Sequence, residues 1–159
     1  MSRRVRIDLV LLAVVAVALA LRLSYLHDLG RLGYLTGVLS PDELYYDQLA
    51  RRVAAGRWLG DSPFFYGPLY PYLLGLLYAI AGPVPAAARA VQLVLGALAC
   101  VPVFWLGRRL FDRRVGLLAA AATAFYGPWL LLSGSLLYDQ LAPLLVTLFL
   151  LAALRARES

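Results

Sequence analysis

The sequence predicts an all-α membrane protein with four transmembrane helices and one large external loop. Of its 159 residues, 62% are hydrophobic and 15% are charged, whereas soluble domains average about 45–50% apolar and about 25% charged residues. The apolar residues gather in long runs, which is typical of membrane spans. All of the basic residues are arginines and most of them flank these runs. We therefore interpret the chain as one membrane module over residues 1–159.

The net charge of +6 could indicate a nucleic-acid partner. The arginines form no patch interleaved with aromatic residues, so we expect them to set membrane topology and expect no nucleic-acid binding. Cys100 lies in an apolar run and is expected to be a small buried residue. His27 has no neighbouring metal ligands, and no metal residues are predicted.

The first predicted span covers residues 7–26 and follows the basic start "MSRRVR". The "ALA" at 18–20 resembles a signal-peptide cleavage site, so a removed leader is an alternative. The apolar pattern continues at Leu21 and Leu23, which favours a retained anchor. Arg22, near the end of this span, is expected to reach the headgroups.

Residues 27–86 form the predicted external loop, which is rich in Gly, Pro, Tyr and acidic residues. Within this loop, residues 69–81 are apolar but short for a span, so we expect an interfacial helix there. This helix and the polar segment before it are the amphipathic elements of the loop.

The remaining predicted spans cover residues 87–106, 115–132 and 139–154. The densest basic cluster, "RRLFDRR" at 108–114, lies in the cytosol if residues 69–81 do not cross the membrane. The sequence thus predicts a multi-pass protein of the cytoplasmic (inner) membrane, with both termini in the cytosol.

The segment "SPDELYYDQLARRVAAG" carries the signals of a capped helix. Ser40 suits the N-cap, Pro41 the first helical position, and Glu43 completes a capping box. Asp47 and Arg51 are four residues apart and can form an ion pair. Gly56 can end the helix.

The same segment also supports a chemical interpretation. A helix N-terminus keeps Asp42 and Glu43 ionised, so either could accept a proton or help to hold a divalent cation. Asp139 falls on the same external face, although it could instead cap the last span. The sequence leaves capping and catalysis open for these three carboxylates.

Four further residues are candidate substrate contacts at this face. Tyr46 lies on the capped helix, and Tyr66 and Tyr70 lie around "FYGPLYP"; an aromatic belt in the headgroup zone is the alternative for them. Arg89, at the outer end of the second span, can meet a phosphate or a carboxylate. Snorkelling to the interface is its alternative.

Taken in order, "PDELYYDQLARRVAAG", "YGPLYPYLLGLLYAIAG" and "ARAVQLVLGALACVPVFWLGRRLF" resemble the start of the GT-C glycosyltransferases. The closest resemblance is to the bacterial protein O-mannosyltransferase and aminoarabinose-transferase group, which is similar to glycosyltransferase family 39. The continuation to "LLYDQLAPLLVTLFLLAALRA" is similar to the third and fourth spans of that group.

The resemblance implies inverting transfer of a sugar from a polyprenyl-phosphate carrier to a lipid or protein acceptor outside the membrane. It maps the catalytic acidic motif onto Asp42 and Glu43, and further site residues onto Asp139 and Arg89. Asp42 would then take the proton of the acceptor hydroxyl. Arg89 would offset charge on the leaving phosphate, while Glu43 and Asp139 would orient the base or the acceptor.

Two departures from the group limit this interpretation. Some relatives carry a Glu-Lys-Pro-like sequence, which is part of a metal site, where this chain reads "FFYGP". The sequence therefore leaves open whether a divalent cation is a cofactor. Relatives also have more spans, so we expect a truncated N-terminal module. The rival class is a non-enzymatic membrane subunit or a transporter fragment, in which the carboxylates only cap helices or pair internally.

Overall fold

The computed structural model describes residues 9–34, 39–59 and 65–158, and this part of the chain is helical without strands. Residues 7 and 8, where the first predicted span begins, lie outside the described residues. The elements are α1 (Leu9–Arg31), α2 (Pro41–Ala54), α3 (Leu69–Ala81), α4 (Pro85–Leu98), α5 (Cys100–Leu110), α6 (Arg113–Phe125), α7 (Gly127–Leu132), the 3₁₀ helix η1 (Tyr138–Gln140) and α8 (Leu141–Glu158).

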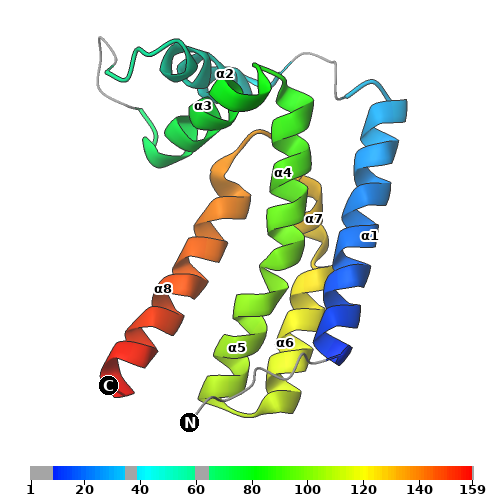
Figure 1. Cartoon of the computed structure of the whole chain (residues 1–159). Coiled ribbons are helices and arrows are strands. Elements are labelled where there is room, and N and C mark those ends of the chain that lie inside the picture. The colour runs from blue at the N-terminus through cyan, green and yellow to red at the C-terminus, as the bar shows by residue number, and fades with distance from the viewer. Residues whose placement is uncertain (1–8, 35–38, 60–64, 159) are drawn as a thin grey trace.

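The long helices run beside one another, and α2 and α3 pack together at one end, over α8 (Figure 1). We call this end the α2–α3 end. Three helical stretches of the described chain are long and apolar enough to cross a membrane: Leu9–Arg31, Pro85–Leu110 and Tyr138–Arg157. The predicted all-helical membrane architecture is confirmed, but the predicted count of four spans is not exact.

The predicted span at 115–132 is broken into α6 and α7 because of Pro128. Proline has no N–H, so it cannot bond the Ala124 carbonyl one turn earlier. The chain becomes extended at Tyr126, with φ −70° and ψ 100°. Arg22 Nη1 donates to the Ala124 carbonyl at 3.4 Å and so supplies a donor that the helix lacks. Arg22 is 0% exposed; the expectation that it reaches the headgroups is wrong.

Helices α5 and α6 form a hairpin in which the two helices pack closely together. Asp112 caps α6 by accepting the Val115 amide at 2.9 Å. A Cβ at Gly116 would lie 2.6 Å from the Phe104 carbonyl, so the two backbones touch. Cys100 is fully buried here, as predicted. The buried core around it consists of Leu11, Ala18, Ala97, Phe104, Ala120 and Ala124.

Helix α2 has the predicted caps. The Glu43 amide donates to Ser40 Oγ at 3.4 Å, and Glu43 Oε2 accepts the Ser40 amide at 3.0 Å, which completes the capping box. Pro41 is the first helical residue. Gly56 has φ +80°, a conformation that favours glycine after a helix.

Helix α3 has the predicted bounds, and its 13 residues rise about 20 Å, which is too short to cross about 30 Å of hydrocarbon. It packs closely on α2, where a Cβ at Gly75 would lie 2.6 Å from Val53. Asp47 joins the two helices because it accepts the Tyr78 hydroxyl and the Arg51 Nε, each at 2.7 Å. The predicted Asp47–Arg51 pair is thus confirmed.

We expect Gly116→Ala to destabilise the protein. Alanine normally stabilises a helix interior by about 1 kcal/mol over glycine, but here its Cβ would collide with backbone and force α5 and α6 apart. Thermal unfolding in detergent should show a lower Tm. Gly127→Ala is the matched control, because a Cβ there meets nothing within 4 Å; equal Tm values for the two variants would contradict the close contact.

Candidate functional site

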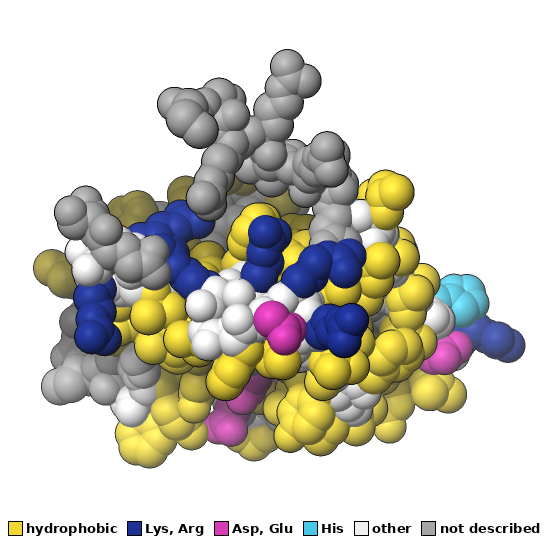
Figure 2. All heavy atoms as spheres, turned by 90° about the horizontal axis from the view of Figure 1, so that it is seen from below, with side chains coloured by type: hydrophobic (Ala, Val, Ile, Leu, Met, Phe, Trp, Pro, Cys, Tyr) yellow, Lys and Arg dark blue, Asp and Glu magenta, His cyan; other side chains and the backbone are white. Residues whose placement is uncertain are grey.

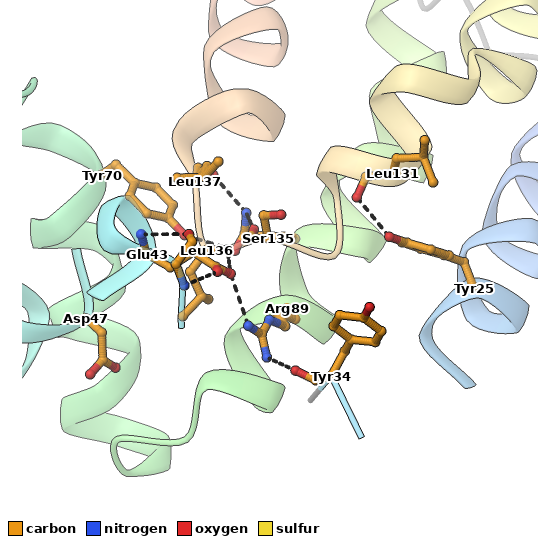
Figure 3. Close-up of polar contacts among 12 residues, drawn as sticks. Tyr25, Tyr34, Glu43, Asp47, Tyr70, Arg89, Leu131, Ser135, Leu136 and Leu137 are labelled. Carbon is orange, nitrogen blue, oxygen red and sulfur yellow. Dashed lines mark hydrogen bonds and ion pairs between the residues drawn. The ribbon is translucent and has the colours of Figure 1, made fainter. Parts of the chain in front are cut away.

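Glu43 lies at the centre of the polar contacts at the α2–α3 end (Figure 3). Its Oε1 accepts from Arg89 Nη2 at 3.0 Å and from the Leu136 amide at 2.9 Å. Its Oε2 accepts the Ser40 amide. One buried carboxylate therefore ties α2 to α4 and to the turn that precedes η1.

Arg89 is the partner that α4 contributes. Its guanidinium is buried, and Nη1 also donates to the Tyr34 carbonyl at 3.3 Å, just after α1. Its ion pair with Glu43 is more deeply buried than the Asp47–Arg51 pair, with side chains 5% and 10% exposed. Arg89 points into the protein and does not snorkel to the interface.

The ionised form of Glu43 is favoured by its hydrogen bonds. Burial by itself would raise the pKa of this carboxyl, but the amides of Leu136 and Ser40 and the Arg89 guanidinium together hold the pKa below its ordinary value. Glu43 thus remains ionised, and both of its carboxylate oxygens accept hydrogen bonds. A carboxylate in this state is poorly suited to accept a substrate proton.

Gln92 forms a second bridge, one turn further along α4. Its Oε1 accepts the Tyr70 hydroxyl at 2.9 Å, and its Nε2 donates to the carbonyls of Ser135 and Leu137 at 3.2 and 2.9 Å. Sequence reasoning missed Gln92. The available signal was a glutamine within an apolar span, three residues after Arg89 and hence on the same helix face.

Asp42 faces the opposite way from its neighbour Glu43. It is exposed, and its Oδ1 accepts the Tyr66 hydroxyl at 3.2 Å. The structure therefore separates the acidic pair into a buried structural carboxylate and an accessible one. Of the two, only Asp42 can meet a substrate without breaking the fold.

A cluster of tyrosines lies beside Asp42. Tyr46 is its centre, with ring centroids 5.7 Å from Tyr66, 5.0 Å from Tyr70 and 6.4 Å from Tyr138. Burial, and then the neighbouring tyrosine phenols and Asp42, raise the pKa of Tyr46 to about 12, so this phenol is neutral at physiological pH. Tyr46 is 1% exposed and supports the other rings. We call Tyr45, Tyr46, Tyr66, Tyr70 and Tyr138 the tyrosine cluster.

Asp139 is half-buried in η1, directly after Tyr138. Its side chain hydrogen-bonds to none of the described residues. Contacts lead from Asp42 through Tyr66 and Tyr46 to Tyr138, the residue before Asp139 in the sequence. Arg89, by contrast, bonds Glu43 and lies on the inner side of the cluster.

Two apolar cavities open beside the tyrosine cluster, and Tyr70 and Leu141 line both. The first, of about 120 Å³, lies between α3, α4 and the start of α8. The second, of about 190 Å³, lies between the start of α3 and α8 and is bordered by Tyr138. Within the described residues, no group of three or more His, Cys, Asp or Glu side chains could hold a metal ion.

Gln140 and Arg22 are buried polar residues that both lie against Gly96 of α4, an arrangement that sequence reasoning also missed. Gln140 Nε2 donates to the Trp129 carbonyl at 2.8 Å. A Cβ at Gly96 would lie 2.4 Å from Gln140 Oε1 and 3.0 Å from Arg22 Nε. Gly96 therefore lets polar side chains from α1 and η1 reach α4.

Comparison with known proteins agrees with the helical membrane architecture. The family model described as dolichyl-phosphate-mannose-protein mannosyltransferase matches residues 61–159. The matched range holds Tyr66, Tyr70, Arg89 and Asp139 but begins after Asp42 and Glu43. No curated protein and no solved structure matches the chain significantly.

We expect Glu43→Gln to lower the free energy of unfolding by about 3–5 kcal/mol, because it leaves the Arg89 charge buried without its counter-charge. Chemical denaturation in mild detergent measures the change. Asp42→Asn is the matched control, and as an exposed substitution it should change stability by about 0.5 kcal/mol or less. Equal losses for both variants would show that Glu43 is not the structural carboxylate.

The Glu43 contacts also predict a pH dependence. Because the folded protein holds the pKa of Glu43 below its unfolded value of 4.5, the stabilisation is complete above that pH and is lost as the pH falls through the folded pKa. The difference in stability between wild type and Glu43→Gln should therefore shrink on acidification below pH 4.5. Thermal unfolding of both proteins across that pH range measures this difference in stability. A difference that does not change with pH would contradict a lowered pKa of Glu43 in the folded protein.

Proposed function

The chain belongs to the dolichyl-phosphate-mannose-protein mannosyltransferase family, and we propose that it is the N-terminal portion of an inverting glycosyltransferase. In this proposal a sugar passes from a polyprenyl-phosphate carrier to a hydroxyl group of a protein or lipid acceptor. Family membership supports a membrane glycosyltransferase of the mannosyltransferase kind. The donor, the acceptor and the residues that act on them are the proposed part.

The division between Asp42 and Glu43 is the observation that carries the proposal. Asp42 is the accessible carboxylate, held by Tyr66 at the edge of the tyrosine cluster. We assign it the role of general base: it takes the proton of the acceptor hydroxyl as that oxygen bonds to the anomeric carbon. The bond from that carbon to the carrier phosphate breaks in the same step, and the phosphate leaves with the electron pair. A single displacement of this kind inverts the anomeric centre.

The other predicted residues take supporting roles. Glu43 is assigned as a positioning residue, because its carboxylate is saturated by Arg89, Leu136 and Ser40. Arg89 would favour the carrier phosphate through its field rather than by direct exposure. Asp139 would orient the acceptor from the opposite side of the tyrosine cluster.

The carrier chain is assigned to the two apolar cavities. They lie directly beside the tyrosine cluster, and their lining is almost entirely hydrocarbon, which suits an isoprenoid chain. A phosphate at the tyrosine cluster would then have its chain between α3 and α8. Tyr66 and Tyr70, which are proposed as substrate contacts, border this position. The ring of Tyr46 packs against both of them.

The distribution of arginines supports an orientation with the α2–α3 end outside. At the opposite end, arginine side chains gather around an acidic side chain among hydrophobic atoms (Figure 2). This end includes Arg108 and Arg114 of the α5–α6 hairpin and Arg155 of α8. Because basic loops stay in the cytosol, we assign this end and both termini to the cytosolic side of the cytoplasmic membrane.

Sugar transfer by Asp42→Asn tests the proposal. Loss of a general base should reduce the rate by about 10²–10⁴-fold without a change in thermal stability. The measurement is transfer of labelled mannose from polyprenyl-phosphate mannose in proteoliposomes that contain the full chain. Asp28→Asn is the matched control, an exposed aspartate at the same end.

Two outcomes would contradict the proposal. Unchanged transfer by Asp42→Asn would remove Asp42 from the chemistry. Absence of both transfer and carrier binding in the wild-type chain would favour a non-enzymatic membrane subunit.

A further inference from the structure

The hairpin of α5 and α6 presents the densest charge of the described chain at the end opposite the tyrosine cluster. Between residues 108 and 114 the sequence places four arginines and a single aspartate. Asp112 uses its Oδ1 to cap α6, where it accepts the Val115 amide. The hairpin tip therefore keeps a strong excess of positive charge.

The backbone contact between the two helices fixes the spacing of these arginines. A Cβ at Gly107 would lie 2.9 Å from the Gly116 Cα, so α5 and α6 are held backbone against backbone where they leave the core. Arg108 projects from the last turn of α5, and Arg114 from the first turn of α6. Both are exposed. The hairpin thus holds the two helix ends that carry these guanidinium groups at a fixed spacing.

Large apolar side chains lie directly beside the charges. Leu110 is 53% exposed, Phe111 72% and Leu118 70%. The Arg108 guanidinium lies over the Trp105 ring, with Cζ 5.0 Å from the ring centroid. Figure 2 shows the same mixture of basic and hydrophobic side chains on this face. Apolar and cationic groups side by side are suited to a ligand with an anionic head and hydrocarbon chains.

We propose that the α5–α6 hairpin binds the phosphodiester headgroup of an anionic phospholipid, with Arg108 and Arg114 on the phosphate and Leu110 and Phe111 against the acyl chains. Guanidinium groups form paired hydrogen bonds with phosphate oxygens. Basic sites between transmembrane helices bind anionic headgroups in the same way. A soluble anion would leave the apolar rim unused, and this rim is the reason for assigning a lipid.

The test compares lipid retention by matched arginine pairs. The full chain is purified from nanodiscs of phosphatidylcholine with and without phosphatidylglycerol, and bound lipids are counted by native mass spectrometry. Arg108→Gln/Arg114→Gln should reduce retention of phosphatidylglycerol by about 25-fold, since each basic residue near an anionic surface contributes about fivefold. Arg155→Gln/Arg157→Gln removes the same charge from exposed positions on α8 and should retain the lipid.

Three results would overturn the proposal. Equal losses in the two double variants would mean general electrostatic attraction without a site. Equal retention of phosphatidylcholine and phosphatidylglycerol by the wild type would mean that no anionic lipid is selected. Stabilisation by inorganic phosphate equal to that by phosphatidylglycerol would mean that the site takes a soluble anion.

A single variant keeps the test informative if the double variant misfolds. Arg114→Gln leaves the contact between Arg108 and Trp105 intact and should lower phosphatidylglycerol retention about fivefold. Unchanged retention in a folded Arg114→Gln protein would also overturn the proposal. Folding is checked by the Tm in phosphatidylcholine alone, where the variant and the wild type should agree.

Discussion

The ion pair between Glu43 and Arg89 is the interaction on which the geometry of the α2–α3 end depends. It joins segments that are 46 residues apart, and the Leu136 amide adds a third segment 93 residues from Glu43. Buried ion pairs often add little net stability, because desolvation offsets the attraction. Their effect here is on orientation. With Glu43 fixed inward, the helix rotation of about 100° per residue turns Asp42 outward.

The tyrosine cluster extends this constraint to the outer side of the site. Tyr46 lies three residues after Glu43 on α2, so the same fixed rotation places its ring inward, between Tyr66 and Tyr70. Tyr70 is anchored in turn by Gln92, on the helix that carries Arg89. Tyr66, which bonds Asp42, is thus linked to α4 through the rings of Tyr46 and Tyr70. The exposed carboxylate sits on a rigid support although it makes a single side-chain hydrogen bond.

Local signals in the sequence were sufficient for α2 and α3, because capping residues, a short apolar run and flanking Gly act within a few positions. They were insufficient for residues 115–132. That stretch is apolar throughout, so its composition predicts a span, while the effect of Pro128 on the Ala124 carbonyl is a property of the backbone. The inward position of Arg22 follows from that break and from the space beside Gly96. Neither the break nor the space beside Gly96 can be predicted from the sequence of α1 alone.

The residues proposed for the site stood out in the sequence, but their contacts did not. Glu43 and Arg89 both stood out as charged residues next to apolar runs, yet their pairing depends on how the fold places α2 relative to α4. Asp42 and Glu43 suit a helix start equally well, so the sequence alone could not separate them. Gln92 was overlooked because a single polar residue does not interrupt an apolar run.

The backbone contact between Gly107 and Gly116 has a consequence for how the chain enters the bilayer. Only Phe111 and Asp112 separate α5 from α6, so these two helices are too tightly joined to insert one after the other with lipid between them. They must enter as a single hairpin. The guanidinium groups at its tip are costly to carry through hydrocarbon, which supports the proposed cytosolic position of the tip.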